Sequence, residues 1–247
     1  MGTVNNQDAV LCEMGLGPLW KLREPRVAIE GDRGVEIAPV EPQPVSSEAQ
    51  VTPFSGELAS MDWGTLGQAV ADCRACGLCQ ARKQAVLGVG DIRADWLFVG
   101  EGPGAEEDER GEPFVGQAGK LLDAMLAAID LKRGKDVYIA NAVKCRPPGN
   151  RTPDPGEMAA CRPFLERQID LIQPRLIVAM GRPAAQTLLQ EEIKIAASRG
   201  RLFEFRGIPV LVTYHPAYLL RNLPDKAKSW QDLVFARRTL AALKAGG

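Results

Sequence analysis

Three residues with chemically versatile side chains each follow a short apolar run. Glu101, Asn141 and His215 supply a carboxylate, a carboxamide and an imidazole. Parallel strands end at a common edge of a sheet, and ligands bind just beyond their carboxyl ends, so these residues can surround one crevice. The sequence therefore favours a site built from distant segments. The apolar runs, each interpreted as a buried strand, are Trp96–Val99, Val137–Ala140 and Val210–Tyr214.

The loop after the first run is rich in glycine and in acidic residues. Gly100, Gly102 and Gly104 supply tight turns and bare backbone, and the acidic run Glu106-Glu107-Asp108-Glu109 follows. These carboxylates would repel a pyrophosphate, and no Gly-Lys-Ser/Thr motif follows, which disfavours a nucleotide-phosphate loop. We interpret Trp96–Lys120 as one wall of an active-site pocket. An ordinary glycine-rich turn with a solvated acidic flank is the alternative.

His215 is the only histidine in the sequence. Single histidines are more often structural than catalytic, but this one ends an apolar strand and precedes the rigid Pro216. The next segment combines Leu219 and Leu220 with the cation Arg221. Proteins use an apolar wedge beside a cation to push into stacked bases and to hold a phosphate. A site that needs two imidazole ligands is excluded, which removes most hydrolytic zinc enzymes.

The cysteines suggest a second site. Cys73 and Cys76 form a Cys-x-x-Cys pair, and with the downstream Cys145 and Cys161 they can close a site of four thiolates. Zinc and a [4Fe-4S] cluster both accept four thiolates, and buried thiols without a metal are a further alternative. Cys79 could replace one ligand or remain a free thiol beside the site. The six cysteines are Cys12, Cys73, Cys76, Cys79, Cys145 and Cys161.

The sequence between these residues alternates strand and helix patterns. A fourth apolar run, Leu176–Ala179, completes a set of four strands. This alternation predicts a three-layer α/β/α domain with a central, mainly parallel four-stranded sheet. A helix that begins near Met61–Leu66 leads into Cys73, and Ser229 is the expected N-cap of the last helix. The other expected helices are Gln117–Ile129, Pro155–Ile172, Pro183–Leu189 and Trp230–Leu243.

Length and composition predict one ordered domain with an N-terminal appendage. The chain has 247 residues and 45% hydrophobic content, and we expect the ordered domain to span residues 61–247. Residues 1–60 include a Pro-rich linker composition and are expected to form a poorly ordered extension. No apolar run reaches the ~18 residues of a membrane span, and no signal-peptide pattern opens the sequence. These features predict a soluble, cytoplasmic protein without disulfide bonds.

The net charge of −1 hides an asymmetry between the two parts of the chain. Residues 1–70 hold 4 Lys and Arg against 10 Asp and Glu, whereas residues 71–247 hold 26 against 21. The predicted folded part is therefore mildly basic. That charge is compatible with contacts to nucleic-acid phosphates without being diagnostic of them.

Taken together, these segments resemble the family 4 uracil-DNA glycosylases, the iron–sulfur branch of the uracil-DNA glycosylase superfamily. The resemblance covers about residues 66–243. It departs from the family pattern at Leu223, which stands between Asn222 and Pro224 where the family often has Asn-Pro directly. The matching motifs are Gly100-Glu101-Gly102-Pro103-Gly104 with Glu107-Asp108 and Pro113-Phe114-Val115-Gly116, then Val137–Asn141 with Lys144–Pro148, and finally His215–Asn222.

The resemblance implies a uracil-DNA glycosylase-like fold and a base-excision repair enzyme associated with the nucleoid. Such an enzyme flips deoxyuridine out of single- or double-stranded DNA and releases free uracil. The implied roles are catalysis by Glu101, Asn141 and His215, uracil contacts from these residues and from Gly102, Glu107 and Phe114, a DNA wedge of Leu219, Leu220 and Arg221, and a [4Fe-4S] cluster on Cys73, Cys76, Cys145 and Cys161.

Two alternatives remain open on the sequence alone. The first is a non-catalytic uracil-DNA binding module with a structural metal site of four cysteines, and the second is a zinc or redox protein without glycosylase activity. Residues 1–60 could recruit a repair or replication protein. The sequence does not decide which carboxylate handles the attacking water.

Overall fold

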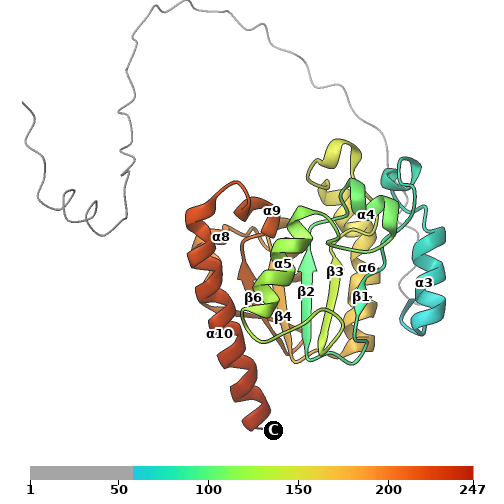
Figure 1. Ribbon diagram of the computed structural model, residues 1–247. Helices are drawn as coiled ribbons and strands as arrows, with labels where there is room; N and C mark the ends of the chain where they lie inside the picture. Colours follow the sequence, from blue (N-terminus) through green and yellow to red (C-terminus); the bar gives the residue numbers. More distant parts are fainter. Residues whose placement is uncertain (1–57, 247) are drawn as a thin grey trace, which may run out of the picture. The chain divides into compact units, whose positions relative to one another are not determined.

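A mixed six-stranded sheet forms the centre of the computed structural model, which describes residues 58–246 (Figure 1). The strand order is β1-β3-β2-β4-β6-β5, with the inner four strands parallel and each edge strand antiparallel to its neighbour. The predicted extension over residues 1–60 lies almost entirely outside the described residues. The strands are β1 (Val89–Gly90), β2 (Trp96–Gly100), β3 (Val137–Asn141), β4 (Leu176–Met180), β5 (Leu202–Phe205) and β6 (Ile208–Thr213).

The structure confirms the four predicted parallel strands. Their apolar sequences suit burial on both faces of the sheet. Every residue of β2, β3 and β4 is buried, as expected for parallel strands that helices cover on either side. The two edge strands were not predicted. β1 has only two residues, and β5 pairs with β6 through a tight turn in which Arg206 (φ +49°) and Gly207 (φ +82°) are left-handed.

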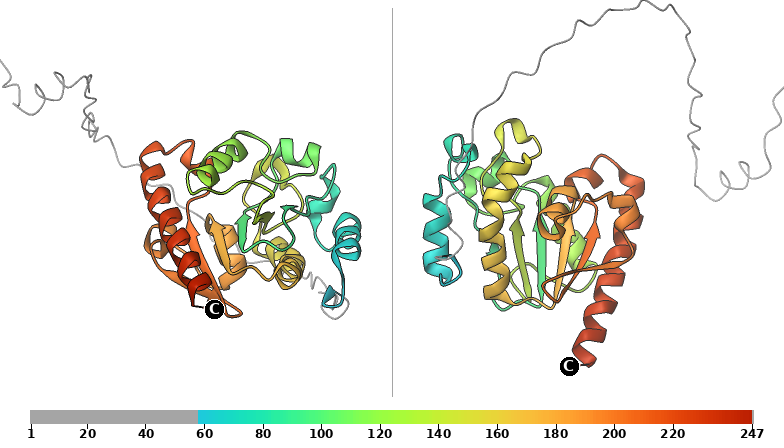
Figure 2. Two further views of the ribbon diagram at one scale, coloured as in Figure 1. Left: turned by 60° about the horizontal axis from the view of Figure 1, so that its bottom comes forward. Right: turned by 180° about the vertical axis from the view of Figure 1, so that it is seen from behind.

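Helices cover both faces of the sheet, which confirms the three-layer architecture (Figures 1 and 2). Successive side chains of a strand point to opposite faces, so Trp96 and Phe98 pack with α5 and α10, whereas Leu97 and Val99 pack with α6 and α7. The helices of at least four residues are α3 (Trp63–Asp72), α4 (Ala105–Arg110), α5 (Gln117–Ala127), α6 (Pro155–Ile172), α7 (Arg182–Leu189), α8 (Ile195–Ser198), α9 (Pro216–Leu219) and α10 (Lys226–Ala245).

The last helix begins earlier than predicted. α10 starts at Lys226 after the N-cap Asp225, so the prediction of Ser229 as N-cap is wrong. Ser229 is 1% exposed and its hydroxyl accepts a hydrogen bond from Thr213 on β6 (3.3 Å), so it packs against the sheet instead of capping the helix. Helix α4 was also missed, because its acidic sequence resembles a solvated loop.

A third apolar cluster lies beside the sheet and joins α3 to α6. It contains Leu66, Val70, Leu78 and Phe164 together with the buried Cys145 and Cys161. The side chain of Asp62 caps α3 by accepting the N–H of Thr65 (2.9 Å), which fixes where this helix begins. Three short 3-10 turns complete the described chain: η1 (Gly77–Gln80), η2 (Pro148–Asn150) and η3 (Leu223–Asp225). Among residues 58–246, no helix has the length and apolar character of a membrane span.

Candidate active site and cysteine cavity

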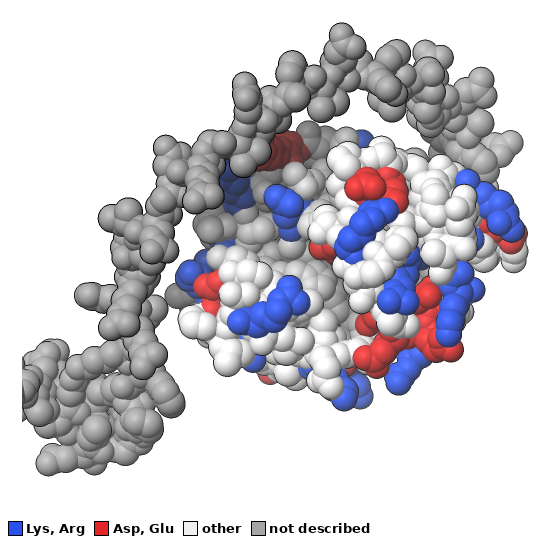
Figure 3. All heavy atoms as spheres, turned by 90° about the horizontal axis from the view of Figure 1, so that it is seen from above, with Lys and Arg blue, Asp and Glu red and all other residues white. Residues whose placement is uncertain are grey.

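The carboxyl ends of the four parallel strands meet at one edge of the sheet. In spatial order, β3, β2, β4 and β6 lead to Asn141, Glu101, Arg182 and His215. A cavity of about 420 Å³ opens at this edge. Figure 3 looks onto it and shows Lys and Arg side chains distributed over the face, with acidic side chains gathered mainly toward one side. The cavity lining includes all six predicted uracil-contacting residues: Glu101, Gly102, Glu107, Phe114, Asn141 and His215.

Asn141 contributes a buried amide without a partner. The residue is 2% exposed, and its Oδ1 is one of the few buried side-chain polar atoms in residues 58–246 that make no hydrogen bond. Buried polar groups nearly always have partners, so an orphaned oxygen in a cavity wall points to a ligand that donates an N–H. The Asn141 backbone is held from the other side, since Lys144 Nζ donates to its carbonyl oxygen (2.9 Å).

His215 is arranged as a neutral hydrogen-bond donor. It is the N-cap of α9, and its Nδ1 accepts the backbone N–H of Ala217 (3.1 Å), which leaves the ring proton on Nε2. Burial and, secondarily, the charge of Arg221 lower the pKa of His215 to about 4, with Glu107 acting in the opposite direction. The imidazole is therefore neutral at pH 7, and its Nε2–H can stabilise an anion that forms in the cavity.

Glu101 follows β2 and lies between Asn141 and the end of β4. Burial raises its pKa, whereas a hydrogen bond from the Thr152 side chain and the charge of Arg182 lower it. The main chain at this point is fixed, because Ala142 N–H donates to Gly100 O (2.9 Å) and Val143 N–H to Glu101 O (3.1 Å). A carboxylate in this position can stabilise a cation or orient a water molecule.

Phe114 lies between α4 and α5 in a left-handed conformation, with φ at +57°. Its ring stacks on that of His215 with a centroid distance of 5.4 Å. Gly100 makes room for this arrangement. A Cβ at Gly100 would lie 2.5 Å from Phe114 Cζ and 2.6 Å from Asn141 Oδ1, so a side chain there would collide with both. Gly100 is therefore required by close approach and not by a turn.

The Glu107 carboxylate is engaged by three backbone N–H groups. Oε2 accepts from Gly104 (3.1 Å), which forms the capping box of α4, and Oε1 accepts from Val115 (3.0 Å) and Gly116 (3.1 Å). Glu107 thus fastens the Phe114 loop to α4, a role that the sequence did not reveal. It also lines the cavity together with the other predicted uracil-contacting residues.

The wedge segment differs from the prediction at one leucine. Leu219 is only 1% exposed on α9, which packs against α5, so it cannot enter DNA without leaving the core. Leu220 is 41% exposed and Leu223, the residue that departs from the family pattern, is 61% exposed. Arg221, which lies between these two leucines in the sequence, lines the active-site cavity. The exposed apolar residues of this segment are therefore Leu220 and Leu223.

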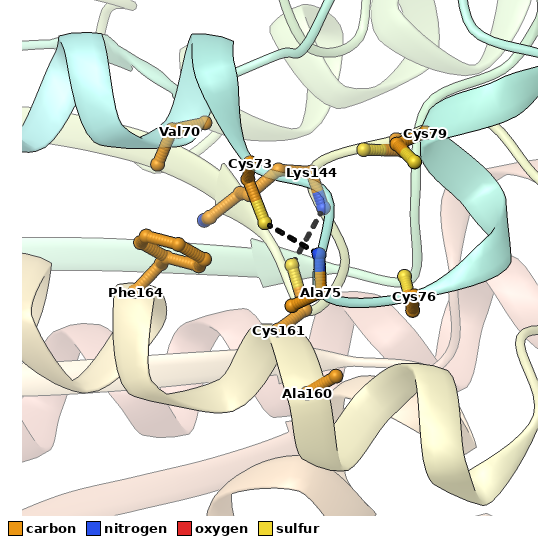
Figure 4. Close-up of a pocket in the computed structure, with 10 residues that line it drawn as sticks. Val70, Cys73, Ala75, Cys76, Cys79, Lys144, Ala160, Cys161 and Phe164 are labelled. Atoms are coloured by element: carbon orange, nitrogen blue, oxygen red, sulfur yellow. Dashed lines mark hydrogen bonds between the residues drawn. The ribbon is translucent and has the colours of Figure 1, made fainter. Parts of the chain in front are cut away.

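Five cysteines line a second, smaller cavity between α3, η1 and the middle of α6. In Figure 4, Cys73 and Cys161 face each other on one side of this cavity, with Cys76 and Cys79 on the other. Cys145, the fifth, also lines it, and Cys12 lies outside the described residues. Among residues 58–246, no three histidine, cysteine or acidic side chains stand in an arrangement that holds a metal ion.

Most of these cysteine sulfurs accept a hydrogen bond from an N–H group. The Ala75 N–H donates to Cys73 (3.5 Å), the Lys144 N–H to Cys161 (3.1 Å) and Arg82 Nη1 to Cys145 (2.8 Å). Burial raises the pKa of Cys76, and a hydrogen bond from the Leu78 backbone opposes this effect. For Cys79 no such donor is present among residues 58–246. The predicted ligands are thus the four sulfurs with donors, and Cys79 is the exception.

Two cations border the cysteine cavity, and the sequence pattern indicated neither role. Arg82 also donates through Nη2 to the carbonyl of Cys73 (3.0 Å), so it joins two predicted ligand segments. Lys144 is 1% exposed, and burial lowers its pKa to about 8. Its Nζ donates to Gln168 Oε1 (2.5 Å) as well as to Asn141. Arg182, which follows β4, is not among the residues that line the active-site cavity, and its effect there is to lower the pKa of Glu101 through its charge.

A family model described as the uracil DNA glycosylase superfamily matches residues 87–234. A type-4 uracil-DNA glycosylase of Thermotoga maritima is 46% identical over 165 residues, which are 66% of this chain and 85% of that protein. One from Archaeoglobus fulgidus is 45% identical over 159 residues, 61% of this chain and 79% of its own length. A type-5 enzyme of Thermus thermophilus is 32% identical over 160 residues, 52% of this chain and 73% of its own. The chain therefore belongs to the uracil DNA glycosylase superfamily, and within it to the type-4 family.

Proposed function

We propose that this protein is a monofunctional uracil-DNA glycosylase that hydrolyses the N-glycosidic bond of deoxyuridine in single- or double-stranded DNA and releases free uracil. The observation that carries the proposal is the orphaned Oδ1 of Asn141, which shares a cavity with the neutral imidazole of His215. The names of the type-4 relatives support the same activity.

Selection of uracil follows from the donors and acceptors of Asn141. Its Oδ1 accepts the N3–H of uracil, and its amide NH2 donates to O4. Cytosine presents an acceptor at N3 and a donor at C4, so it would leave buried polar groups mismatched. Glu107, whose carboxylate is held in place by three backbone N–H groups, would crowd C5 and exclude the methyl group of thymine.

Bond cleavage separates a uracil anion from an oxocarbenium-like sugar. The Nε2–H of His215 would donate to uracil O2, and the backbone N–H of Gly102 could add a second donor, as in an oxyanion hole. Glu101 would stabilise the sugar cation or position the attacking water. The lowered pKa of His215 fits this role, because a neutral imidazole keeps its Nδ1 acceptor bond to Ala217 while it donates from Nε2.

Base flipping would use the residues at the mouth of the cavity. Phe114 would stack on the extruded ring, a contact worth on the order of 1–3 kcal/mol. Leu220 would fill the space that the base leaves, and Arg221 would hold the DNA backbone. The exposure of Leu220 supports its part of the predicted wedge, whereas the burial of Leu219 argues against a role in DNA.

The cysteine cavity would hold a [4Fe-4S] cluster on Cys73, Cys76, Cys145 and Cys161. The donor set fits such a group by its chemistry and not by the present spacing of the sulfurs: four of the five thiols that line the cavity are the proposed ligands, N–H groups donate to their sulfurs, and the cations Arg82 and Lys144 lie beside them. Bound there, the cluster would supply a structural cross-link and no step of base removal. It would tie the end of α3 to the segment after β3 and to α6.

The test is release of uracil from a deoxyuridine oligonucleotide, followed by alkaline cleavage of the abasic strand, with thymine and hypoxanthine substrates in parallel. We expect strand cleavage at uracil. Tight binding of the oligonucleotide without alkali-labile sites would instead favour the non-catalytic binding module. Recruitment of a repair or replication protein through residues 1–60, which lie almost entirely outside the described residues, and association with the nucleoid remain predictions.

A further inference from the structure

Arg133 lies outside the active-site cavity and donates hydrogen bonds to the backbone at Phe114, whose ring lines the cavity. Arg133 lies in the connection between α5 and β3. It donates through Nη1 to the carbonyl oxygen of Pro113 (2.8 Å) and through Nη2 to that of Phe114 (2.8 Å). Its Nε donates to Asp123 Oδ1 on α5 (3.0 Å). A guanidinium can donate hydrogen bonds to two consecutive carbonyl oxygens and a carboxylate at the same time, because its N–H groups form a fixed planar fork.

The conformation of Phe114 needs support of this kind. A φ of +57° is unfavourable for a bulky residue, so the surroundings must over-determine it. Glu107 holds the chain just after Phe114 through the N–H groups of Val115 and Gly116, and Arg133 holds the carbonyls of Pro113 and Phe114. The backbone is therefore fastened on both sides of the strained residue.

The position of the ring depends on this backbone. Phe114 is 6% exposed, and its ring fills the space above Gly100 and stacks on His215. If the φ of Phe114 relaxed to an ordinary value, the Cα–Cβ bond would point elsewhere and the ring would leave the cavity wall. The ion pair of Arg133 with Asp123 is 23% and 52% exposed, so it contributes little to global stability by itself.

We propose that Arg133 is a positioning residue for base binding, which acts through Phe114 without touching the base. It keeps Phe114 in the left-handed conformation that places the aromatic ring where a flipped pyrimidine stacks. The identity of the base rests on the proposed function, but the effect on binding of free uracil requires no catalysis and can be measured separately.

The experiment measures the affinity of the holo-protein for free uracil by calorimetry, in the wild type and in Arg133→Ala, Phe114→Ala and the double variant. We expect Arg133→Ala to weaken uracil binding about tenfold, the order of effect that base–aromatic stacking supplies. Because Arg133 acts through the ring, the double variant should bind no more weakly than Phe114→Ala alone. With deoxyuridine DNA, the Michaelis constant should rise while kcat changes less.

Two further variants separate positioning from folding. Arg237→Ala breaks an exposed pair of the same kind, Arg237 with Asp130 (3.0 Å), which does not contact the Phe114 loop, and it should leave uracil binding unchanged. Arg133→Lys keeps the charge but loses the fork, so it should restore only part of the affinity. If Arg133→Ala fails to fold, the uracil affinities of Arg133→Lys, Phe114→Ala and their double variant are compared instead.

An unchanged uracil affinity in folded Arg133→Ala, or effects of Arg133→Ala and Phe114→Ala that add, would overturn the proposal. These outcomes differ from failure of the proposed function. A wild type that binds uracil but does not cleave deoxyuridine DNA would refute glycosylase activity alone. A wild type that cleaves this DNA while Arg133→Ala behaves identically would refute the role of Arg133 alone.

Discussion

The two cavities differ in what holds their residues together, although Asn141 in one and Cys145 in the other are only four residues apart. The active-site cavity is built on the ends of four buried parallel strands, so its residues are placed by the hydrophobic core. The cysteine cavity lies beside the sheet, between α3, η1 and α6, where a smaller apolar cluster supports it. The first is therefore expected to persist without a cofactor, and the second to depend on one.

The largest effect should come from removing the His215 hydrogen-bond donor from the active-site cavity. His215→Ala should lower the rate of uracil release by about 10²–10³-fold, because one preorganised donor to a developing anion typically supplies 2.7–4 kcal/mol. Asn141→Ala should act in the same direction. Single-turnover assays measure the rate, and absorbance near 400 nm with thermal unfolding should show an intact, brown protein. A loss of colour would mean that the two cavities are not independent.

The dependence of the cysteine cavity on a cofactor can be tested with a matched pair of variants. Cys145→Ser should abolish most of the absorbance near 400 nm and speed hydrogen exchange in α3 and η1, because it removes a proposed cluster ligand. The serine hydroxyl still offers an acceptor to Arg82, so the change isolates the loss of the thiolate. Exchange in β2 and β4 should change little. Cys79→Ser should retain the colour, since Cys79 lacks the N–H donors of the other sulfurs. If Cys79→Ser were colourless and Cys145→Ser brown, the ligand assignment would be wrong.

The burial of His215 should appear in the pH dependence of stability. Its pKa is lowered to about 4 from the usual value of 6.5. Between these values the unfolded chain binds a proton that the folded protein does not, so the free energy of unfolding should fall as the pH decreases through this range. The expected contribution is on the order of 3 kcal/mol. Urea unfolding of wild type and His215→Gln at pH 7.5 and pH 4.5 measures it, and equal pH dependence would contradict it.

The smallest effect concerns the mouth of the active-site cavity. Leu220→Ala and Leu223→Ala should each slow uracil release from duplex DNA several-fold and change release from single strands less, because an apolar wedge is needed mainly where a base leaves a stack. The ratio of duplex to single-strand rates measures this, with Leu202→Ala, 41% exposed on the edge strand β5, as the control. Equal losses on both substrates would assign these leucines to another role.

The sequence predicted the features that depend on local pattern. The apolar runs of β2, β3 and β6 identify strands, and the topology of parallel strands then brings Glu101, Asn141 and His215 to one edge. The structure confirms the predicted convergence, because the three side chains line a single cavity.

Features that depend on tertiary contacts were not predictable. The burial of Leu219 follows from the packing of α9 on α5, which no pattern in the segment reveals. Arg133 is 20 residues from Pro113 in sequence, and its role follows from a return of the chain after α5. The edge strand β5 was missed because its residues alternate between exposed and partly buried, with no continuous apolar run.

The missing side chain of Gly100 has a consequence for protein engineering. The Phe114 ring and the Asn141 amide both lie against the place that one methyl group would occupy, so even alanine at this position would displace two side chains that line the cavity. Efforts to broaden the range of damaged bases that the enzyme accepts should therefore vary Asn141 or Phe114 and leave position 100 untouched in any library.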